Sequence, residues 1–221
     1  MGKKIISFDV ATKSMGVAII ELMDIVKVED AKYISNIVSE YLPDALSELV
    51  LDYGNCQATN DIIKFEYLDV WDLSDNQGDR LNIVTPAKVL SQYLQWVDRE
   101  FGAMGIMIYE NQMNLNDKSR TMSHYIIYHY AMKDTMIVKM FPHEKNKIHF
   151  SPELKYQNFI KKYAKSYTAN KAHSKANLQY LAKLYNLDIA HIANKNLDDV
   201  ADALMQIFAY LHLAPGLNVK T

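Results

Sequence analysis

Short apolar runs separated by polar turns dominate the first part of the chain and predict β-strands. Residues Lys4–Val10, Gly16–Leu22 and Ile62–Trp71 are the three clearest runs. Because only the turn Ala11–Met15 separates the first two, we expect them to form an antiparallel hairpin, which the third run extends into a meander.

After the meander, positions with helical spacing alternate with further short apolar runs. Thr85-Pro86 predicts the start of a helix, with the threonine as its cap, and Gly102 and Gly105 are expected to end it. The elements expected next are a strand over Gly105–Glu110, a long helix over Lys118–Met140, a strand over Lys147–Phe150, and helices over Pro152–Tyr163, Ser174–Tyr185 and Leu197–Leu213. Hairpin strands followed by alternating helices and strands predict an α/β fold, with a mixed five-stranded sheet and helices on both of its faces.

The length and the pattern favour one domain. A chain of 221 residues can bury a full core without metal or disulfide staples. We expect a single domain over residues 1–213, with an insertion around residues 24–60 to which the pattern assigns no role, and a tail over residues 214–221. Within the insertion we expect a helix near Asp44–Leu51 and a polar surface loop at Gly54–Asp61.

Composition is typical of a globular protein from a reducing compartment. With 49% hydrophobic and 23% charged residues, the chain is not a disordered, collagen-like or coiled-coil rod. Cys56 is the only cysteine, so no internal disulfide is possible and no zinc-finger spacing exists. No stretch of about 20 apolar residues is present, and the apolar run at the start is too short for a signal peptide. We expect a cytoplasmic or nuclear protein that is neither secreted nor bound to a membrane.

The small net charge of −2 hides an uneven distribution. From Lys139 to Lys195, 11 lysines stand against 3 acidic residues, a net charge of +8, whereas the rest of the chain carries −10. Aromatic residues lie between these lysines, among them Tyr156, Phe159, Tyr163, Tyr167 and Tyr180. A basic segment with interleaved aromatics favours a polyanionic partner such as nucleic acid, and solvated helix faces are the alternative of equal weight.

Four acidic residues lie where predicted elements begin or end. Asp9 and Glu110 each end an apolar strand, while Asp199 and Asp202 lie in the first turn of the last helix. Their spacing of three places the last two on one helical stripe, which can face the strand ends at the rim of the sheet. Carboxylate oxygens suit Mg²⁺ or Mn²⁺, and two such ions about 4 Å apart can activate water and stabilise the leaving oxygen of a phosphodiester.

Each of these acids, taken alone, also has a simpler explanation. An aspartate in a first helical turn commonly caps the helix or complements its dipole. The adjacent Asp198 can act as a ligand or as such a cap. Asp9 is different, because an acid that ends an apolar strand is costly to bury unless it is paired or coordinates a metal. The predicted chemistry therefore depends on the four acids meeting at one point.

Several motifs carry a family resemblance. The segment Phe8–Ala18 resembles the first motif of RuvC-like Holliday junction resolvases, which have the RNase H fold, and Tyr109–Gln112 is similar to their second acidic motif. Leu197–Leu204 closely resembles the last motif of the poxvirus resolvases and their relatives. Upstream of it, Ser174–Leu178 resembles the basic helix of that family, and Ile148–Pro152 is similar to the strand before the helix.

The resemblance implies roles for individual residues. The implied metal-binding catalytic acids are Asp9, Glu110, Asp199 and Asp202. The implied cofactor is Mg²⁺, with Mn²⁺ as a substitute. Lys175 would lie near the scissile phosphate, with Lys171 as its rival for that role. One departure is Ala11, where family members usually carry glycine, and it bears on the turn more than on the chemistry.

The function that these features favour is a metal-dependent endonuclease that resolves four-way DNA (Holliday) junctions by paired symmetric nicks. The alternatives are a general RNase H-like nuclease and a non-catalytic module that binds branched nucleic acid. Sugar kinases and actin-like ATPases have phosphate loops that resemble the first motif. They need a second related domain and a glycine-rich loop, for which the chain is too short and has no match.

The predicted helix Lys118–Met140 bears on assembly. Apolar residues surround nearly its whole circumference: Met122, Tyr125, Ile126, Tyr128, Tyr130, Met132, Met136, Ile137 and Met140. Because a helix that is apolar all round is buried all round, we expect one side to cover the sheet and the other to contact a second copy. A helix sandwiched within its own domain is the alternative. A two-fold homodimer would match the two-fold symmetry of a four-way junction.

Overall fold

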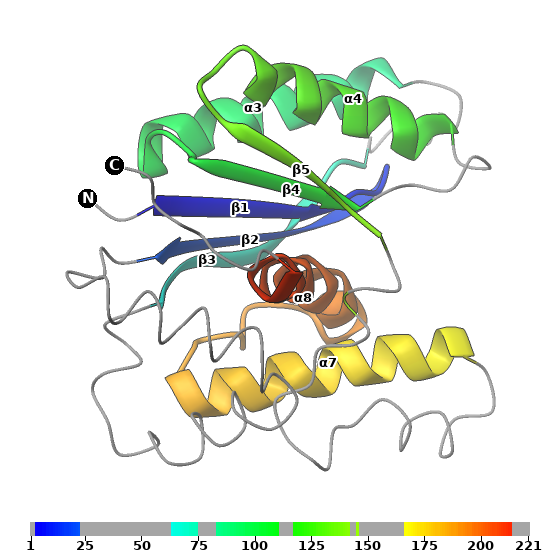
Figure 1. Ribbon diagram of the computed structural model, residues 1–221. Helices are drawn as coiled ribbons and strands as arrows, with labels where there is room; N and C mark the ends of the chain where they lie inside the picture. Colours follow the sequence, from blue (N-terminus) through cyan, green and yellow to red (C-terminus); the bar gives the residue numbers. More distant parts are fainter. Residues whose placement is uncertain are drawn as a thin grey trace.

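A mixed sheet forms the centre of the fold (Figure 1). The protein is seen in a computed structural model that describes residues 3–22, 63–74, 83–110, 117–141, 145 and 166–213. In these residues the sheet has five strands: β1 (Lys3–Asp9), β2 (Ser14–Leu22), β3 (Ile63–Asp72), β4 (Ile106–Glu110) and β5 (Met136–Met140). Their order across the sheet is β3-β2-β1-β4-β5. The first three strands are antiparallel neighbours, whereas β4 is parallel to β1 and β5 is parallel to β4.

The amino-terminal hairpin confirms the expected meander. In the hairpin Asp9 pairs with Gly16, so the two strands return across a short turn, and β3 then pairs along the whole of β2. The predicted bounds of the third strand are shifted by one residue at each end in the structure. Because successive strand residues point to opposite faces, each strand sends alternate apolar side chains into two separate cores.

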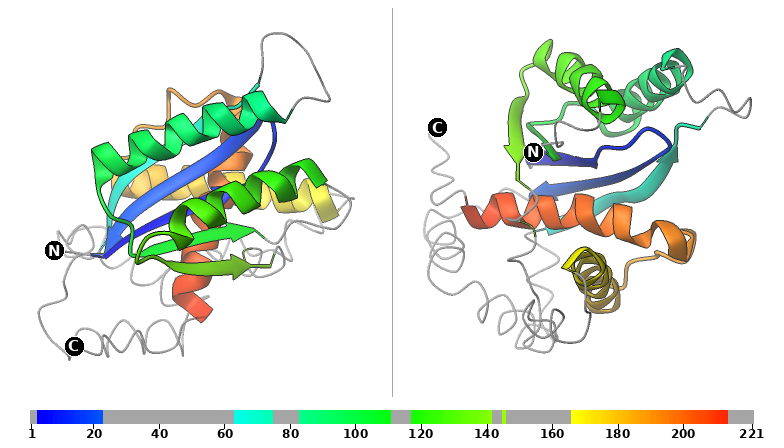
Figure 2. Two further views of the ribbon diagram at one scale, coloured as in Figure 1. Left: turned by 90° about the horizontal axis from the view of Figure 1, so that it is seen from above. Right: turned by 90° about the vertical axis from the view of Figure 1, so that its right-hand side faces the viewer.

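Helices cover both faces of the sheet (Figures 1 and 2). On one face lie α3 (Val84–Phe101) and α4 (Asp117–Ala131), which share a core with β1, β2 and β3. On the other face α8 (Leu197–Leu213) packs directly on β1 and β2, and α7 (Ser166–Tyr185) packs on the outer side of α8. A short 3₁₀ turn, η3 (Asn194–Asn196), leads into α8. The α/β class with a mixed five-stranded sheet and helices on both faces is thereby confirmed.

Two helices show how well local signals set helix ends. α3 begins at Val84 with Ile83 at the cap position and no side-chain cap, so the cap predicted for Thr85 is wrong. Its end is as expected: Gly102 follows the last helical residue with φ of 73°, a conformation that favours glycine. α7 begins eight residues before the predicted start at Ser174 and ends at Tyr185 as predicted.

The long helix predicted over Lys118–Met140 is wrong. The helix α4 ends at Ala131, a turn follows, and residues from Met136 to Met140 form the edge strand β5. Hydrogen bonds to the carbonyls of Tyr130 and Lys133 close the turn, and no glycine or proline marks it. Since the apolar residues of this segment continue the helical spacing of α4, the spacing alone did not separate the two elements, although the β-branched Ile137 and Val138 favour a strand.

Other predictions lie outside the described residues. They are the helix near Asp44–Leu51, the loop at Gly54–Asp61, the strand over Lys147–Phe150, the helix over Pro152–Tyr163, the insertion at 24–60 and the tail at 214–221. Among the helices of the described ranges, none combines the length and the apolarity needed to cross a bilayer.

Candidate active site

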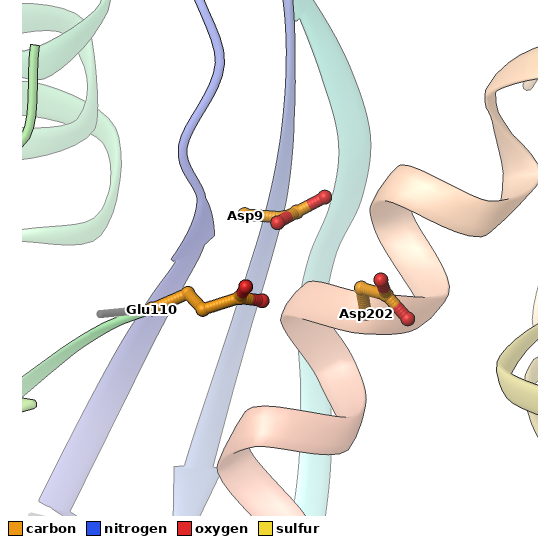
Figure 3. Close-up of side chains that lie close together, drawn as sticks. All are labelled: Asp9, Glu110 and Asp202. Carbon is orange, nitrogen blue, oxygen red and sulfur yellow. The ribbon is translucent and has the colours of Figure 1, made fainter. Parts of the chain in front are cut away.

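Three carboxylates converge at one edge of the sheet (Figure 3). Asp9 ends β1 and Glu110 ends β4, and the parallel pairing of Phe8 with Tyr109 brings these two strand ends side by side. Asp202 reaches them from α8. Each of the three acids offers one ligand oxygen, and these oxygens all lie within 4.8 Å of one another. The three acids therefore form a cluster of the size that one cation can bridge.

Close packing of α8 on β2 brings Asp202 to the strand ends. A Cβ built on Gly16 would lie 2.0 Å from the carbonyl oxygen of Asp199, so only glycine allows this approach. Beside it, the hydroxyl of Ser14 donates a hydrogen bond of 3.0 Å to Oδ2 of Asp199. The first turn of α8 is therefore held against the start of β2, on the same edge of the sheet as the end of β1.

A lysine lies inside the acidic cluster. The ammonium nitrogen of Lys145 is 2.6 Å from Oε2 of Glu110 and 2.7 Å from Oδ2 of Asp202. Only 7% of its side chain is exposed to solvent, compared with 16% and 17% for those two acids. Lys145 is thus a buried counter-charge shared by two of the three carboxylates.

The cluster has unusual proton affinities. Burial raises the pKa of Asp9 well above its ordinary value, and the ammonium of Lys145 opposes that shift. The charges of nearby acids reinforce the rise in the Asp9 pKa: Asp202, Glu110 and Asp199. For Lys145, burial alone would lower the pKa, yet the attraction of the surrounding carboxylates raises it overall. Like charges in a partly buried site favour uptake of a positive ion.

The chemistry of the donor set fits a hard divalent cation. Carboxylate oxygens are the ligands that Mg²⁺ and Mn²⁺ prefer, and neither a thiolate nor an imidazole belongs to the described cluster. Three acids converging from separate elements would repel one another without a counter-charge. Asp9, Glu110 and Asp202 could therefore hold such an ion.

The remaining predicted residues lie around the cluster. Asp199 is outside the group of three, is hydrogen-bonded to Ser14, and has a pKa raised by burial and by the neighbouring charge of Asp198. Asp198 is nearly buried and forms an ion pair with Lys171. Lys175 donates a hydrogen bond of 2.9 Å to the carbonyl of Asn194, in the turn that leads into α8. The roles assigned to these residues stay predictions.

Lys145 was missed as a site residue, although a signal for it exists. In the sequence it is one of 11 lysines of the basic segment. However, β5 is parallel to β4, and Met140 pairs with Glu110. The chain that follows β5 therefore leaves the sheet at the edge where Glu110 lies, and a lysine five residues after Met140 can reach it. Predicting this position required β5 to be recognised as a strand.

Solved structures with a similar fold come from a virus and a bacterium. The fowlpox virus resolvase, determined in complex with substrate Holliday junction DNA, has a TM-score of 0.53 and 15% sequence identity, and the match covers 95% of this chain and 97% of that one. RuvC of Thermus thermophilus has a TM-score of 0.50 and 9% identity, with 96% and 97% of the two chains covered. No protein-family model and no curated protein matches the sequence. The chain therefore shares the RNase H-like fold of these resolvases.

Proposed function

We propose that the protein is a metal-dependent endonuclease that resolves four-way DNA junctions by paired, symmetric nicks. The observation that carries the proposal is the convergence of Asp9, Glu110 and Asp202 at one edge of this fold. The acids come from the ends of two parallel strands and from the helix that packs across them. The fowlpox virus resolvase, which binds a Holliday junction, has a similar fold over nearly the whole chain.

In this proposal the three clustered acids hold the cation, with Asp199 as a fourth ligand. Bound Mg²⁺ would supply an activated water and would stabilise the leaving oxygen of the phosphodiester. Ser14 orients Asp199 through its hydrogen bond, and Lys171 neutralises the adjacent Asp198. Lys175 remains the lysine proposed to lie near the scissile phosphate, since it belongs to the basic segment and contacts Asn194 in the turn that leads into α8.

The basic segment supports a DNA partner. Lys183 and Lys195 are exposed, and Tyr167 on the same helix as Lys183 has 68% of its surface accessible. The lysine beside the Tyr167 ring is Lys171, whose ammonium nitrogen lies 5.4 Å from the ring centre. Lysines and an exposed aromatic ring are suited to contacts with phosphates and bases. Lys145 differs from Lys183 and Lys195, because it is buried among the carboxylates and contributes no surface charge.

The proposal includes a homodimer. The surface expected from the sequence was a helix that is apolar all round, whereas the surface proposed from the structure is the outward side of α4 and the turn after it. On α4, Met122 and Ile126 are fully buried against the sheet. The outward side and the turn after it expose large apolar residues: Tyr125 (47%), Tyr128 (69%), Met132 (72%) and Met136 (44%). Exposed large apolar residues on one helix and the turn after it are suited to contact with a second copy. Tyr128→Glu and Met132→Glu should give monomers in sedimentation, whereas a wild-type protein that is itself monomeric at micromolar concentration would contradict the dimer.

The experiment that tests the function is cleavage of a synthetic four-way junction with Mg²⁺, each strand labelled in turn. The expected products are nicks at matching positions on opposed strands, absent without the metal. A linear duplex of equal length should be cut far less. Equal cleavage of the duplex or of an RNA–DNA hybrid would identify a general RNase H-like nuclease instead. Tight junction binding with no cleavage at any Mg²⁺ or Mn²⁺ concentration would identify a non-catalytic binding module.

A further inference from the structure

The position of Lys145 within the acidic cluster has a consequence for metal binding. Its ammonium nitrogen contacts Oε2 of Glu110 at 2.6 Å and Oδ2 of Asp202 at 2.7 Å. These are two of the three acids whose oxygens could hold one ion. The lysine therefore already bridges the carboxylates that a divalent cation would bridge.

The two positive ions compete for the same carboxylate oxygens, and the reason is electrostatic. A divalent cation of the Mg²⁺ type binds carboxylate oxygens at about 2.1 Å. If it bound the same two oxygens as the ammonium group, the two positive centres would lie within about 4 Å of each other, where like charges in a partly buried site repel strongly. Each oxygen would also have to serve both a hydrogen bond from Lys145 and a metal bond. Binding of the metal at these oxygens is therefore favoured when the ammonium group moves away.

We propose that Lys145 is a tethered cation that occupies the divalent-metal position in the metal-free protein and is displaced when the metal binds. This inference rests on the metal site of the proposed function and adds a competitor to it. In the metal-free protein the ammonium group keeps Glu110 and Asp202 from repelling each other, so the site stays assembled. The same contact weakens metal binding, because the ion has to take the place of a bound partner.

A purely structural ion pair would behave differently. If Lys145 only supported the site, its removal would loosen Glu110 and Asp202 and weaken metal binding. If it competes with the metal, its removal strengthens metal binding while it destabilises the metal-free protein. The sign of the change in metal affinity therefore separates the two roles.

The first test compares Lys145→Met with a matched control, Lys88→Met, in which the lysine is exposed on α3, on the opposite face of the sheet. Mn²⁺ binding is measured by titration calorimetry and by the electron paramagnetic resonance signal of free Mn²⁺. Thermal unfolding is measured with and without the ion. We expect Lys145→Met to bind Mn²⁺ about tenfold more tightly or better. Without metal, we expect this variant to unfold at a lower temperature than the wild type. Added Mn²⁺ should raise its unfolding temperature by more than it raises that of the wild type. The control should match the wild type.

Unchanged or weaker Mn²⁺ binding by Lys145→Met would overturn the inference. Should that variant fail to fold without metal, the wild-type chain supplies a second test. Amine acylation followed by mass spectrometry should find Lys145 protected in the metal-free protein and several-fold more reactive when Mn²⁺ is bound. Lys88 in the same sample should be acylated at the same rate with and without Mn²⁺. No rise at Lys145 while Mn²⁺ binds would overturn the displacement.

The proposed function and this inference can fail separately. Asp202→Asn should lose Mn²⁺ binding if the three acids form the metal centre. If it does, and Lys145→Met binds Mn²⁺ like the wild type, the metal centre stands and only the competition is wrong. If neither the wild type nor Lys145→Met binds Mn²⁺, both ideas are wrong.

Discussion

The two faces of the sheet have different chemistry, although the same five strands build both. On the face covered by α8 the strands present Ser7 and Asp9 from β1, and Ser7 donates a 3.3 Å hydrogen bond to the buried Gln206. On the face covered by α3 and α4, the core is rich in aromatic rings. There Trp71 stacks on Tyr93 with ring centres 4.8 Å apart and meets Phe8 edge-on at 5.6 Å.

The alternation along each strand separates these two environments. Within β1, Ile5 belongs to the core under α8, and Ile6 and Phe8 belong to the core under α3 and α4. Because side chains alternate, Asp9 continues the series of Ile5 and faces α8. The face under α8 can therefore carry charged side chains and a closely packed helix, while the face under α3 and α4 supplies most of the aromatic packing. We expect substitutions on the two faces to separate activity from stability.

The largest expected difference comes from the carboxylates. Asp202→Asn, like Asp9→Asn and Glu110→Gln, should lower junction cleavage by about a thousandfold or more, equivalent to about 4 kcal/mol in the barrier. Junction binding should persist, because it depends on lysines. Asp98→Asn is the matched control on the other face, since Asp98 forms ion pairs with Lys133 and His129. Rates come from single-turnover cleavage. Near-normal cleavage by Asp202→Asn would contradict the site, and an equal loss in Asp198→Asn would reassign the ligand.

The reverse result is expected on the aromatic face. Trp71 is 1% exposed and contacts Phe8 and Tyr93. Trp71→Ala should lower the free energy of unfolding by about 3–5 kcal/mol, because it leaves a cavity. Urea denaturation measures the loss, and the cleavage rate per folded molecule should stay close to that of the wild type. A large loss of cleavage without a loss of stability would show that this face also takes part in catalysis.

A substitution at Gly16 should lower both the stability of the fold and the rate of cleavage. The added methyl group of Gly16→Ala would meet backbone atoms of Asp199 and Val200, at 2.0 and 2.8 Å respectively, so α8 has to move away from β2. We expect a destabilisation of about 1–3 kcal/mol, as for an overpacked core, and a loss of cleavage because Asp202 moves with the helix. Unfolding and cleavage are measured on the same preparation. Normal cleavage in a destabilised Gly16→Ala protein would show that the site tolerates a shift of α8.

The smallest effect concerns the pH dependence of stability. Burial raises the pKa of Asp9, so the folded state favours the protonated acid, and the stability linked to this group falls as pH rises from the ordinary carboxyl range through the raised pKa. Asp9→Asn lacks this fall. In metal-free buffer its unfolding temperature should exceed that of the wild type by a few degrees at neutral pH, where about 1 kcal/mol corresponds to about 2–4 °C. The gain should shrink toward pH 4. A gain that is independent of pH would contradict the assigned cause.

Local patterns were sufficient for much of the fold. The bounds predicted for β1, β3, β4 and the start of α8 agree with the structure within one residue, because continuous apolar runs and terminal acids mark them. The strand β5 was missed because its five residues continue the apolar spacing of α4 across a turn without glycine or proline. The β-branched Ile137 and Val138 are the local features of Met136–Met140 that favour a strand over a further helical turn, and two residues are a weak signal. The pairing of this segment with β4 decides between the two.

The candidate site was predictable to the extent that it depends on strand ends. Asp9 and Glu110 could be placed together because parallel strands end at one edge of the sheet. Asp202 could be placed near them because helical spacing puts it on the stripe of its helix that faces inward. The ion pair of Lys145 with Glu110 and Asp202 depends on contacts across 35 and 57 residues. The position of Lys145 could be predicted only after β5 had been recognised as a strand.

The order of the elements along the chain also determines when the site can exist during synthesis. Since the amino-terminal part of a protein leaves the ribosome first, all five strands emerge before α8, which supplies Asp202. Until then Asp9 and Glu110 lack their third partner, and one face of the sheet has no cover from α8. A nascent chain of this kind cannot bind the ion at three carboxylates, so in the proposed function it is not expected to cleave DNA until translation passes α8. While this face of the sheet is exposed, the growing chain is at the stage at which it most needs a chaperone.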